Sequence, residues 1–596
     1  MRINPTNPQA LIKAAQGHIA VDILLQNVQV VNLFTGEIAP GAVGIFEGMI
    51  AFVDFDPENL NRETLTYQAK QTIDGQGQYL IPGFIDAHLH IESTMMTPRH
   101  FSAAVLPWGT TTVVIDPHEI GNVLGAEGVK YMAQSVSDLP IRYYVLAPSC
   151  VPALPGMESS GADFYATDIQ QLTKAEGIFG IGEVMDFHGV LNNDARMVDI
   201  LKQANQQHQY IQGHAPGMFG RRLNAYLCSG PTNDHESRSG QEAKDKMRLG
   251  MYVDARESSA SQNVRDIVEA VKDFRYHDLL CLCTDDREAS DILESGHMNY
   301  VVKTAIDAGL DPITAIRCAT LHTARDLGVR NLGAVAPGYV ADVQLIASLT
   351  EPKPSLVISH GQVVARDNQL VTPFASKMSP VEELNTVDNI PVLSESDLTI
   401  TAPLQNGTVN VNVMHYLRPN GSLTEWRPTD ITVKDGKLQL PAGHMFALVQ
   451  NRYGLFDQRT LAVVSGFGLR EGAIASTVSH DSHNLTAIFD TPANALVAIQ
   501  QVIEQRGGIA SCSNGEVSAN IPLQVAGLMS LEPCEVVAQQ SEQMKAVLRY
   551  QGLTEAPNPT MRISTMALPV IPKAKLSDKG LIDVANHCFV PLFIDE

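Results

Sequence analysis

Two histidines separated by a single residue, His88 and His90, end a short apolar run, YLIPGFIDAHLH, at residues 79–90. Side chains two positions apart on a β-strand point to the same face, so both imidazoles can reach one metal ion. Many such pairs are only surface or hydrogen-bonded histidines, and the pair alone is a weak signal. It predicts a metal site only if other ligands meet it in the folded chain.

Four more residues that can bind a metal end later apolar runs: Glu183, His214, His235 and Asp285. If these runs are parallel strands of one barrel, four histidines and two carboxylates converge on one mouth. Such a set is enough for two divalent ions bridged by a carboxylate, with positions left open for water. Imidazole and carboxylate ligands without thiolate suit Mn, Fe or Zn, and the sequence does not choose among the three.

The chemistry expected at this centre is hydrolysis. A bound water whose pKa falls from 15.7 to ~7 becomes a hydroxide nucleophile at neutral pH. Asp285 is the candidate for carrying the proton of the water to the leaving group. Its neighbour Asp286 should point to the opposite face of a regular strand, although a change of register would exchange the two. Other nearby polar residues are candidates for the substrate pocket: Glu92, Asp116, His118, Glu119, Arg256 and Glu257.

The elements that must position these residues alternate between strand and helix. From about residue 81, eight short apolar runs end in polar residues, and most precede a stretch with helical periodicity such as NVRDIVEAVKDF. Alternation of this kind implies a parallel sheet, and eight units over about 200 residues fit a (β/α)8 TIM-type barrel. The sixth run, LCSGPTNDHES, is the weakest strand by propensity.

Sequence rich in β-branched residues flanks the barrel on both sides, and Gly and Pro interrupt it as they interrupt short antiparallel strands. A polar segment with a proline, residues 374–390, is expected to link domains. We therefore expect a small composite β-sandwich of residues 1–80 and 331–375, a barrel of residues 81–330, and a C-terminal α+β domain of residues 391–596.

Two helices are expected outside the strand–helix repeats. The first is a short lead-in within residues 1–20. The second covers residues 311–326, with Asp311 as its N-cap and Pro312 at its first helical position.

The composition is that of an ordinary globular protein, with 44% hydrophobic and 18% charged residues. The 42 Lys and Arg against 65 Asp and Glu give a net charge of −23, which opposes binding to nucleic acid or anionic membranes. The eight cysteines are expected to be free thiols. Since neither a secretory signal nor an apolar run of membrane length is visible, we expect a cytoplasmic protein.

Several motifs occur together and in order: PGFIDAHLHIESTMMTP, VVIDPHEIGNVLG, GHAPG, RLNAYLCSGPTNDHES and CLCTDDR. They resemble those of the adenine deaminases of the amidohydrolase superfamily, from about residue 25 to the end of the chain. The resemblance implies a binuclear centre, with manganese or iron as the expected ions and zinc as the alternative. It also implies hydrolysis of adenine at C6 by a metal-activated hydroxide, release of hypoxanthine and ammonia, a role in purine salvage, and a homo-oligomer, expected to be a dimer.

Carried over by position, the resemblance assigns His88, His90 and Asp285 to one ion and His214 and His235 to the other, with Glu183 as the bridge. Asp285 and Glu183 would be the catalytic residues. Many superfamily members have a carbamylated lysine in place of Glu183, which argues against a typical dihydroorotase or hydantoinase. Glu92 or Glu119 would protonate a ring nitrogen of the purine as hydroxide adds.

The segment SHDSHN, residues 479–484, also resembles the C-terminal domain of this family. We expect this domain to cover the barrel mouth or to supply a residue to it. A second metal site at His480, Asp481 and His483 is the less favoured interpretation, because two histidines and an aspartate in a loop are more often structural.

Two other functions remain open at this point. An amidohydrolase acting on another aminopurine or on a cyclic amide would need the same metals and differ only in its pocket. A barrel that serves as a scaffold without catalysis is disfavoured, because such proteins usually lose metal ligands and this chain keeps all six.

Overall fold

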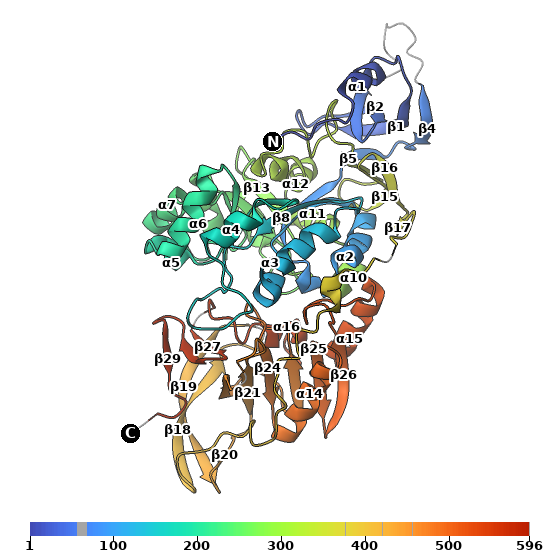
Figure 1. Cartoon of the computed structure of the whole chain (residues 1–596). Helices are drawn as coiled ribbons and strands as arrows, with labels where there is room; N and C mark the ends of the chain where they lie inside the picture. Colours follow the sequence, from blue (N-terminus) through green and yellow to red (C-terminus); the bar gives the residue numbers. More distant parts are fainter. Residues whose placement is uncertain (56–67, 376, 420, 456, 572, 595–596) are drawn as a thin grey trace.

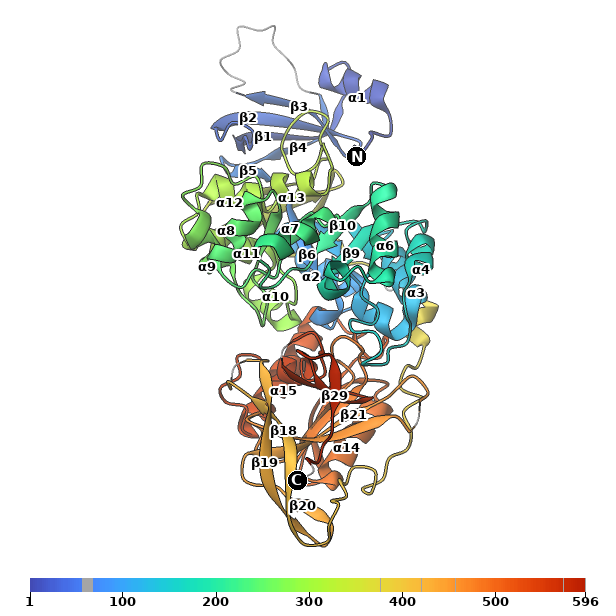
Figure 2. The ribbon, with the colours of Figure 1, turned by 90° about the vertical axis from the view of Figure 1, so that its left-hand side faces the viewer.

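The computed structural model describes residues 1–55, 68–375, 377–419, 421–455, 457–571 and 573–594. They form three parts that follow one another along the long axis of the molecule (Figures 1 and 2). A sheet near the N-terminus lies at one end, alternating strands and helices form the middle, and a second sheet with its helices lies at the other end.

The middle part contains parallel strands in chain order. One sheet consists of β6 (Phe84–Leu89), β7 (Thr110–Ile115), β8 (Arg142–Ala147), β9 (Ile178–Val184) and β10 (Tyr210–Gly213). Another consists of β11 (Asn233–Asp234), β12 (Tyr252–Arg256) and β13 (Leu280–Cys283). Backbone hydrogen bonds join the two, from Thr232 N to Ile211 O (3.1 Å) and from Asp285 N to His88 O (3.0 Å). The strands therefore form a curled parallel sheet of the TIM-barrel type. β11, which lies in the run with the weakest strand propensity, has 2 residues.

Helices follow these strands and pack on the outer side of the curled sheet (Figure 2). They are α2 (Pro98–Val105), α3 (His118–Ser135), α4 (Ala166–Leu172), α5 (Phe187–Leu191), α6 (Ala195–Gln206), α7 (Gly220–Cys228), α8 (Gly240–Arg248), α9 (Val264–Val271), α10 (Ala289–Ser295), α11 (Met298–Asp307), α12 (Pro312–Cys318) and α13 (Leu321–Asp326). The helix predicted at 311–326 is interrupted at Thr320 and forms α12 and α13. Its predicted cap is present, because the Asp311 carboxylate accepts a hydrogen bond from Thr314 N at 2.9 Å.

The sheet near the N-terminus combines chain from both sides of the barrel. Its strands are β1 (Val21–Val31), β2 (Ile38–Phe46), β3 (Met49–Phe55), β4 (Ala69–Asp74), β5 (Tyr79–Pro82), β14 (Val343–Ile346), β15 (Pro354–Ser359), β16 (Gln362–Arg366) and β17 (Gln369–Leu370). The two halves meet where β14 pairs antiparallel with β5. The described strands form one continuous hydrogen-bonded sheet, with α1 (Pro8–Ala15) packed beside β3.

The C-terminal part is mixed α and β. One large sheet has the strand order β20-β19-β18-β22-β21-β24-β23-β25-β26. Its strands are β18 (Gly407–Tyr416), β19 (Thr424–Lys434), β20 (Lys437–Gln439), β21 (His444–Gln450), β22 (Arg459–Ser465), β23 (Ala473–Ser476), β24 (Leu485–Phe489), β25 (Gly508–Ser513) and β26 (Glu516–Pro522). The remaining elements are α14 (Pro492–Glu504), α15 (Cys534–Tyr550), α16 (Pro559–Ser564), β27 (Ala574–Ser577), β28 (Gly580–Asp583) and β29 (Cys588–Val590).

The C-terminal part packs against the end of the barrel that carries the predicted metal ligands. Ser530 N donates to Met95 O at 2.8 Å, and Asn484 Nδ2 donates to Ser159 O at 2.8 Å. In addition, Lys545 Nζ lies 2.7 Å from Glu288 Oε2. These contacts place the loop between β23 and β24 over the mouth of the barrel.

Two further expectations concern the whole chain. All eight cysteines are free thiols, as predicted. Among the described residues, every helix is too short or too polar to cross a membrane.

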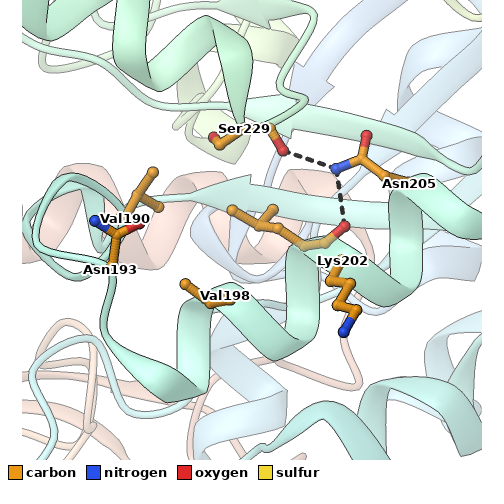
Figure 3. Close-up of a pocket in the computed structure, with 7 residues that line it drawn as sticks. Val190, Asn193, Val198, Lys202, Asn205 and Ser229 are labelled. Atoms are coloured by element: carbon orange, nitrogen blue, oxygen red, sulfur yellow. Dashed lines mark hydrogen bonds between the residues drawn. The ribbon is translucent and has the colours of Figure 1, made fainter.

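A separate pocket lies on the outer layer of the barrel, beside α6 (Figure 3). Its lining residues are Val190, Asn193, Val198, Leu201, Lys202, Asn205 and Ser229. Asn205 lies at one side of it and donates hydrogen bonds to the carbonyls of Leu201 and Ser229. Because this lining contains neither histidine nor carboxylate, the pocket lies apart from the predicted chemistry.

Candidate metal centre

Glu183, at the end of β9, is the residue around which the predicted histidines gather. Its Oε1 lies 3.4 Å from His90 Nε2. Its Oε2 lies 2.5 Å from His214 Nδ1 and 3.2 Å from His235 Nε2. One carboxylate thus faces histidines from three strand ends, which is the position that a bridging ligand requires.

Asp285 faces the other side of the same group. Its Oδ1 lies 3.5 Å from both His88 Nε2 and His90 Nε2. Its Oδ2 accepts a hydrogen bond from Arg256 at 2.5 Å, and Arg256 also binds Glu236. The six predicted ligands are therefore brought together, although their positions in sequence span almost 200 residues.

The donor set fits a divalent metal. His90 Nδ1 lies 2.8 Å from Asp116 O, which can only accept, so this nitrogen carries the proton and Nε2 keeps its lone pair. Likewise, His88 Nδ1 lies 2.8 Å from Oε1 of Gln212, whose amide nitrogen donates to Ala87 O. His88 Nε2 is buried without a hydrogen-bond partner among the described residues. Both rings therefore direct a free lone pair at the centre.

The possible ligand groups overlap. Donor atoms lie within 4.8 Å of one another in four sets around the centre: His88–His90–Glu183, Glu183–His214–His235, His88–His235–Asp285 and His90–Asp285–Asp286. Since the first two sets share Glu183, the arrangement suits two ions bridged by this carboxylate.

Electrostatics keep the two central carboxyl groups ionised. Burial raises the pKa of Glu183, but the facing His214 and His235 lower it more, so the pKa lies well below its usual range. Burial also raises the pKa of Asp285, but Arg256 and the facing His88 lower it more, so this pKa likewise lies well below its usual range. Ionised carboxylates are the form that binds a metal.

A second layer of residues fixes these ligands. Asp116 Oδ2 accepts a hydrogen bond from the backbone N–H of Glu183 at 2.7 Å. This contact needs a glycine at position 182, because a Cβ on Gly182 would lie 2.2 Å from the same oxygen. The local sequence Gly182–Glu183 therefore both supplies the ligand and leaves room for the group that holds it.

The residues predicted for the substrate pocket lie at different distances from the centre. Arg256 binds Asp285 directly, and His118, the first residue of α3, has its Nε2 3.5 Å from Glu183 Oε1. Glu92 accepts a hydrogen bond from Ile120 N at 3.2 Å, and burial together with Glu119 raises its pKa to about 8. Glu257 is buried with its pKa raised to about 7, and among the described contacts it has none with the six ligands.

One prediction about this site is wrong. Asp286 was expected on the face opposite Asp285, yet its carboxylate lies with His90 and Asp285 in one possible ligand group. The cause is the backbone: β13 ends at Cys283, and Asp285 has a left-handed φ of 54°. The alternation rule applies only to regular strand, so it does not hold at this position.

Gln212 is a site residue that the sequence reasoning missed. It lies on β10 two positions before His214, and it fixes the ring of His88. The signal that could have found it is the same alternation that links His88 and His90, applied backwards from His214.

Another pocket lies between the barrel mouth and the C-terminal part. The barrel contributes Glu92, Ser93, Met95 and Glu288, and the C-terminal part contributes Val478, His480, Ile509, Thr560, Met561 and Ser564. Both parts of the chain therefore line this pocket.

Comparison with known proteins decides the family. Residues 79–376 match the amidohydrolase family, and residues 422–588 match the adenine deaminase C-terminal domain. An adenine deaminase of Kosmotoga olearia is 37% identical over 588 residues, which cover 98% of each chain. The chain belongs to the adenine deaminase family. Two other relatives in this family are adenine deaminase 2 of Carboxydothermus hydrogenoformans, 36% identical over 98% of this chain and 99% of its own, and the adenine deaminase of Methanothrix thermoacetophila, 37% identical with the same coverage.

Membership in the adenine deaminase family accounts for the donor set. The chain is a metal-dependent hydrolase of the amidohydrolase type, and the clustered histidines and carboxylates are suited to divalent metal ions. The match to the C-terminal domain begins beyond the barrel and includes the loop with His480 and His483 that lies against it.

Proposed function

We propose that this protein hydrolyses adenine at C6 to hypoxanthine and ammonia, as part of purine salvage. The observation that carries the proposal is the likeness over 98% of the chain to proteins named adenine deaminase, combined with six clustered metal-binding side chains. When bound, a divalent ion at this cluster supplies the Lewis acidity that makes water a nucleophile near neutral pH.

The metal ligands belong to the same proposal. His88, His90 and Asp285 hold one ion, His214 and His235 hold the other, and Glu183 bridges them. The shared position of Glu183 in two of the possible ligand groups supports this assignment. Manganese or iron is the expected metal, with zinc as an alternative, because imidazole and carboxylate donors suit all three.

Asp285 carries the proton in the reaction we propose. It takes a proton from the attacking water and delivers it to the amino group that leaves C6 as ammonia. Arg256 holds Oδ2 of Asp285 and so directs Oδ1 toward the histidines. Glu92 and Glu119 are the candidates for protonating the purine ring, since both are buried and Glu92 lines the interdomain pocket.

The finer architecture and the setting of the enzyme are also proposals. The two backbone links between the parallel sheets support closure into an eight-stranded barrel at residues 81–330. The proposed architecture has two further domains: a composite flanking domain of residues 1–80 and 331–375, and a C-terminal domain of residues 391–596. A cytoplasmic homodimer without nucleic acid or membrane partners rests on the family resemblance and on the net charge of −23.

A substrate panel tests the reaction. Metal-loaded protein is incubated separately with adenine, other aminopurines and cyclic amides, and ammonia release and ultraviolet absorbance are followed. We expect adenine to be the preferred substrate. A preference for another aminopurine or a cyclic amide would be consistent with the proposed metal centre but would show that adenine is not the substrate.

A matched pair of variants tests the role of Asp285. Asp285→Asn should lower kcat by about 10²–10⁴-fold, because it removes the proton carrier. Asp278→Asn, which changes an exposed aspartate near the opposite end of β13, should leave kcat unchanged. Equal activity in both variants would remove Asp285 from the mechanism.

A further inference from the structure

One side chain joins β6 and β13, the first and last of the parallel strands, beside the metal centre. Asp86 lies on β6, two positions before His88, and Thr284 directly follows the end of β13 at Cys283. Asp86 Oδ1 accepts a hydrogen bond from Thr284 N at 3.1 Å, and Asp86 Oδ2 accepts one from Thr284 Oγ1 at 2.5 Å. Both side chains are fully buried. The Asp86 carboxylate therefore fixes Thr284, which lies 198 residues later in the chain.

The same carboxylate holds the residues that face the metal centre. Asp86 Oδ1 accepts a further hydrogen bond from His88 N at 3.3 Å, and Asp285 N donates to His88 O at 3.0 Å. Asp285 has a left-handed φ of 54°, which is uncommon for a residue other than glycine. Because Thr284 precedes Asp285 directly, its two hydrogen bonds to Asp86 fix the point at which the chain turns. The direction of the Asp285 carboxylate depends on that point.

The hydroxyl of Thr284 is also held from its other side, by His297. The hydroxyl gives its one proton to Asp86, so it can only accept from His297 Nε2, which lies 3.3 Å away. His297 Nδ1 then accepts from Thr110 Oγ1 at 3.0 Å. Each hydroxyl and ring proton in the row from Thr110 to Asp86 is used once. A side chain without a hydroxyl at position 284 would interrupt this row at its centre.

We propose that Thr284 is a positioning residue, which holds Asp285 in its active orientation through the two hydrogen bonds to Asp86. The inference rests on the proposed function, in which Asp285 carries the proton. Neither Thr284 nor Asp86 lines the interdomain pocket, so both act on the rate of the reaction and not on the binding of substrate. A displacement of the Asp285 carboxylate by about 1 Å is enough to lower the rate by about 10²-fold.

Replacing the hydroxyl tests this role. Thr284→Val keeps the shape of the side chain and removes its hydroxyl, so kcat at saturating metal should fall by about 10²-fold, with KM and bound metal near their wild-type values. Thr284→Ser keeps the hydroxyl and should retain most of kcat. Thr284→Cys has only a weak donor and should lie between the two, which leaves a measurable series even if one variant does not fold.

A buried threonine elsewhere in the barrel provides the control. The Thr323 hydroxyl on α13 donates to Cys318 O at 3.0 Å and is as fully enclosed as that of Thr284. Thr323→Val should therefore leave kcat near the wild-type value. A wild-type kcat in Thr284→Val, or an equal loss in Thr323→Val, would contradict a specific role for Thr284.

A double-mutant cycle shows whether Thr284 acts through Asp285. In the Asp285→Asn background the proton carrier is already lost, so Thr284→Val should cause no further decrease in kcat. The same fold decrease in both backgrounds would overturn the proposal, because the two residues would then act independently.

The wild-type protein, measured in parallel on the substrate panel, separates this inference from the proposed function. Failure of the wild type to hydrolyse any of the substrates would overturn the proposed function and this inference with it. An active wild type with equal losses in both backgrounds of the cycle would overturn only the role of Thr284.

Discussion

His88 and His90 each use one ring nitrogen for positioning and leave the other for the metal centre. The Nδ1 atoms are bound by Gln212 Oε1 and by the carbonyl of Asp116, so the orientation of each ring is set before any metal arrives. Gln212 on β10 therefore sets the orientation of the His88 ring on β6.

Gln212 gives the first prediction. Gln212→Ala removes the acceptor at His88 Nδ1 and should weaken metal binding by about 10–100-fold, while Gln212→Glu keeps an acceptor and should weaken it less. Competition with a coloured chelator measures both affinities. Wild-type affinity in Gln212→Ala would show that Gln212 does not position His88.

At this scale the sequence predicted which residues meet, because each candidate ends an apolar run and parallel strands end at one mouth. It could not predict the positive φ at Asp285, which brings Asp286 to the same group. It also gave no hint of Glu119 facing His483, since that contact joins distant parts of the chain.

At the scale of elements, a buried lysine on α8 joins the loops that follow β10 and β11. Lys246 Nζ lies 2.7 Å from both Asp234 Oδ2 and Glu242 Oε1, and 2.8 Å from Ala215 O. Asp234 precedes His235, and Ala215 follows His214. The lysine therefore connects the two strand ends that carry these histidines.

Replacing this lysine gives the second prediction. Lys246→Met leaves Asp234 and Glu242 buried without their cation, and the free energy of unfolding should fall by about 3–5 kcal/mol. Arg248→Met on the same helix removes only an exposed pair with Asp245 and should change it by less than about 1 kcal/mol. Urea unfolding measures the free energy of unfolding of both variants. An equal decrease in the two variants would contradict the structural role of Lys246.

The order of strands and helices could be predicted from the alternation of apolar runs and helical periodicity. The break between α12 and α13 could not. Thr320, in the middle of the predicted helix, has φ −146° and ψ −89°, and its hydroxyl donates to Ile316 O. Leu321 of α13 packs in the same core cluster as α12, whereas Ala324 of α13 packs in another, so tertiary packing overrides a local sequence that favours one helix.

At the scale of the whole molecule, charged side chains fasten the C-terminal part to the barrel. Lys545 on α15 binds Glu288 at 2.7 Å and the Ser290 hydroxyl at 3.0 Å, and both lysine and glutamate are buried. Glu288 also lines the interdomain pocket. Docking of the C-terminal part and the shape of the pocket therefore depend on the same pair.

This pair gives the third prediction. Lys545→Met leaves Glu288 buried without its cation, so hydrogen exchange in α10 and α15 should become faster and the midpoint of urea unfolding should fall. Lys130→Met, which removes an exposed pair with Glu127, is the control and should have little effect. Unchanged exchange in Lys545→Met would show that the pair does not fasten the two parts.

The composite sheet and the position of the C-terminal part could be predicted in outline, because β-rich sequence flanks the barrel and the motif at 479–484 resembles the family. The contacts that join the parts could not. Side chains such as Lys545 and Glu288 come from a helix and a loop more than 250 residues apart, and no periodic pattern relates them.

The most direct test of the account is the deamination of adenine by protein stripped of metal and then reconstituted with Mn²⁺, Fe²⁺ or Zn²⁺. Hypoxanthine and ammonia should form in equal amounts after reconstitution and be nearly absent before it. Turnover of adenine by the metal-free protein at the same rate, or its absence with all three metals, would contradict the account.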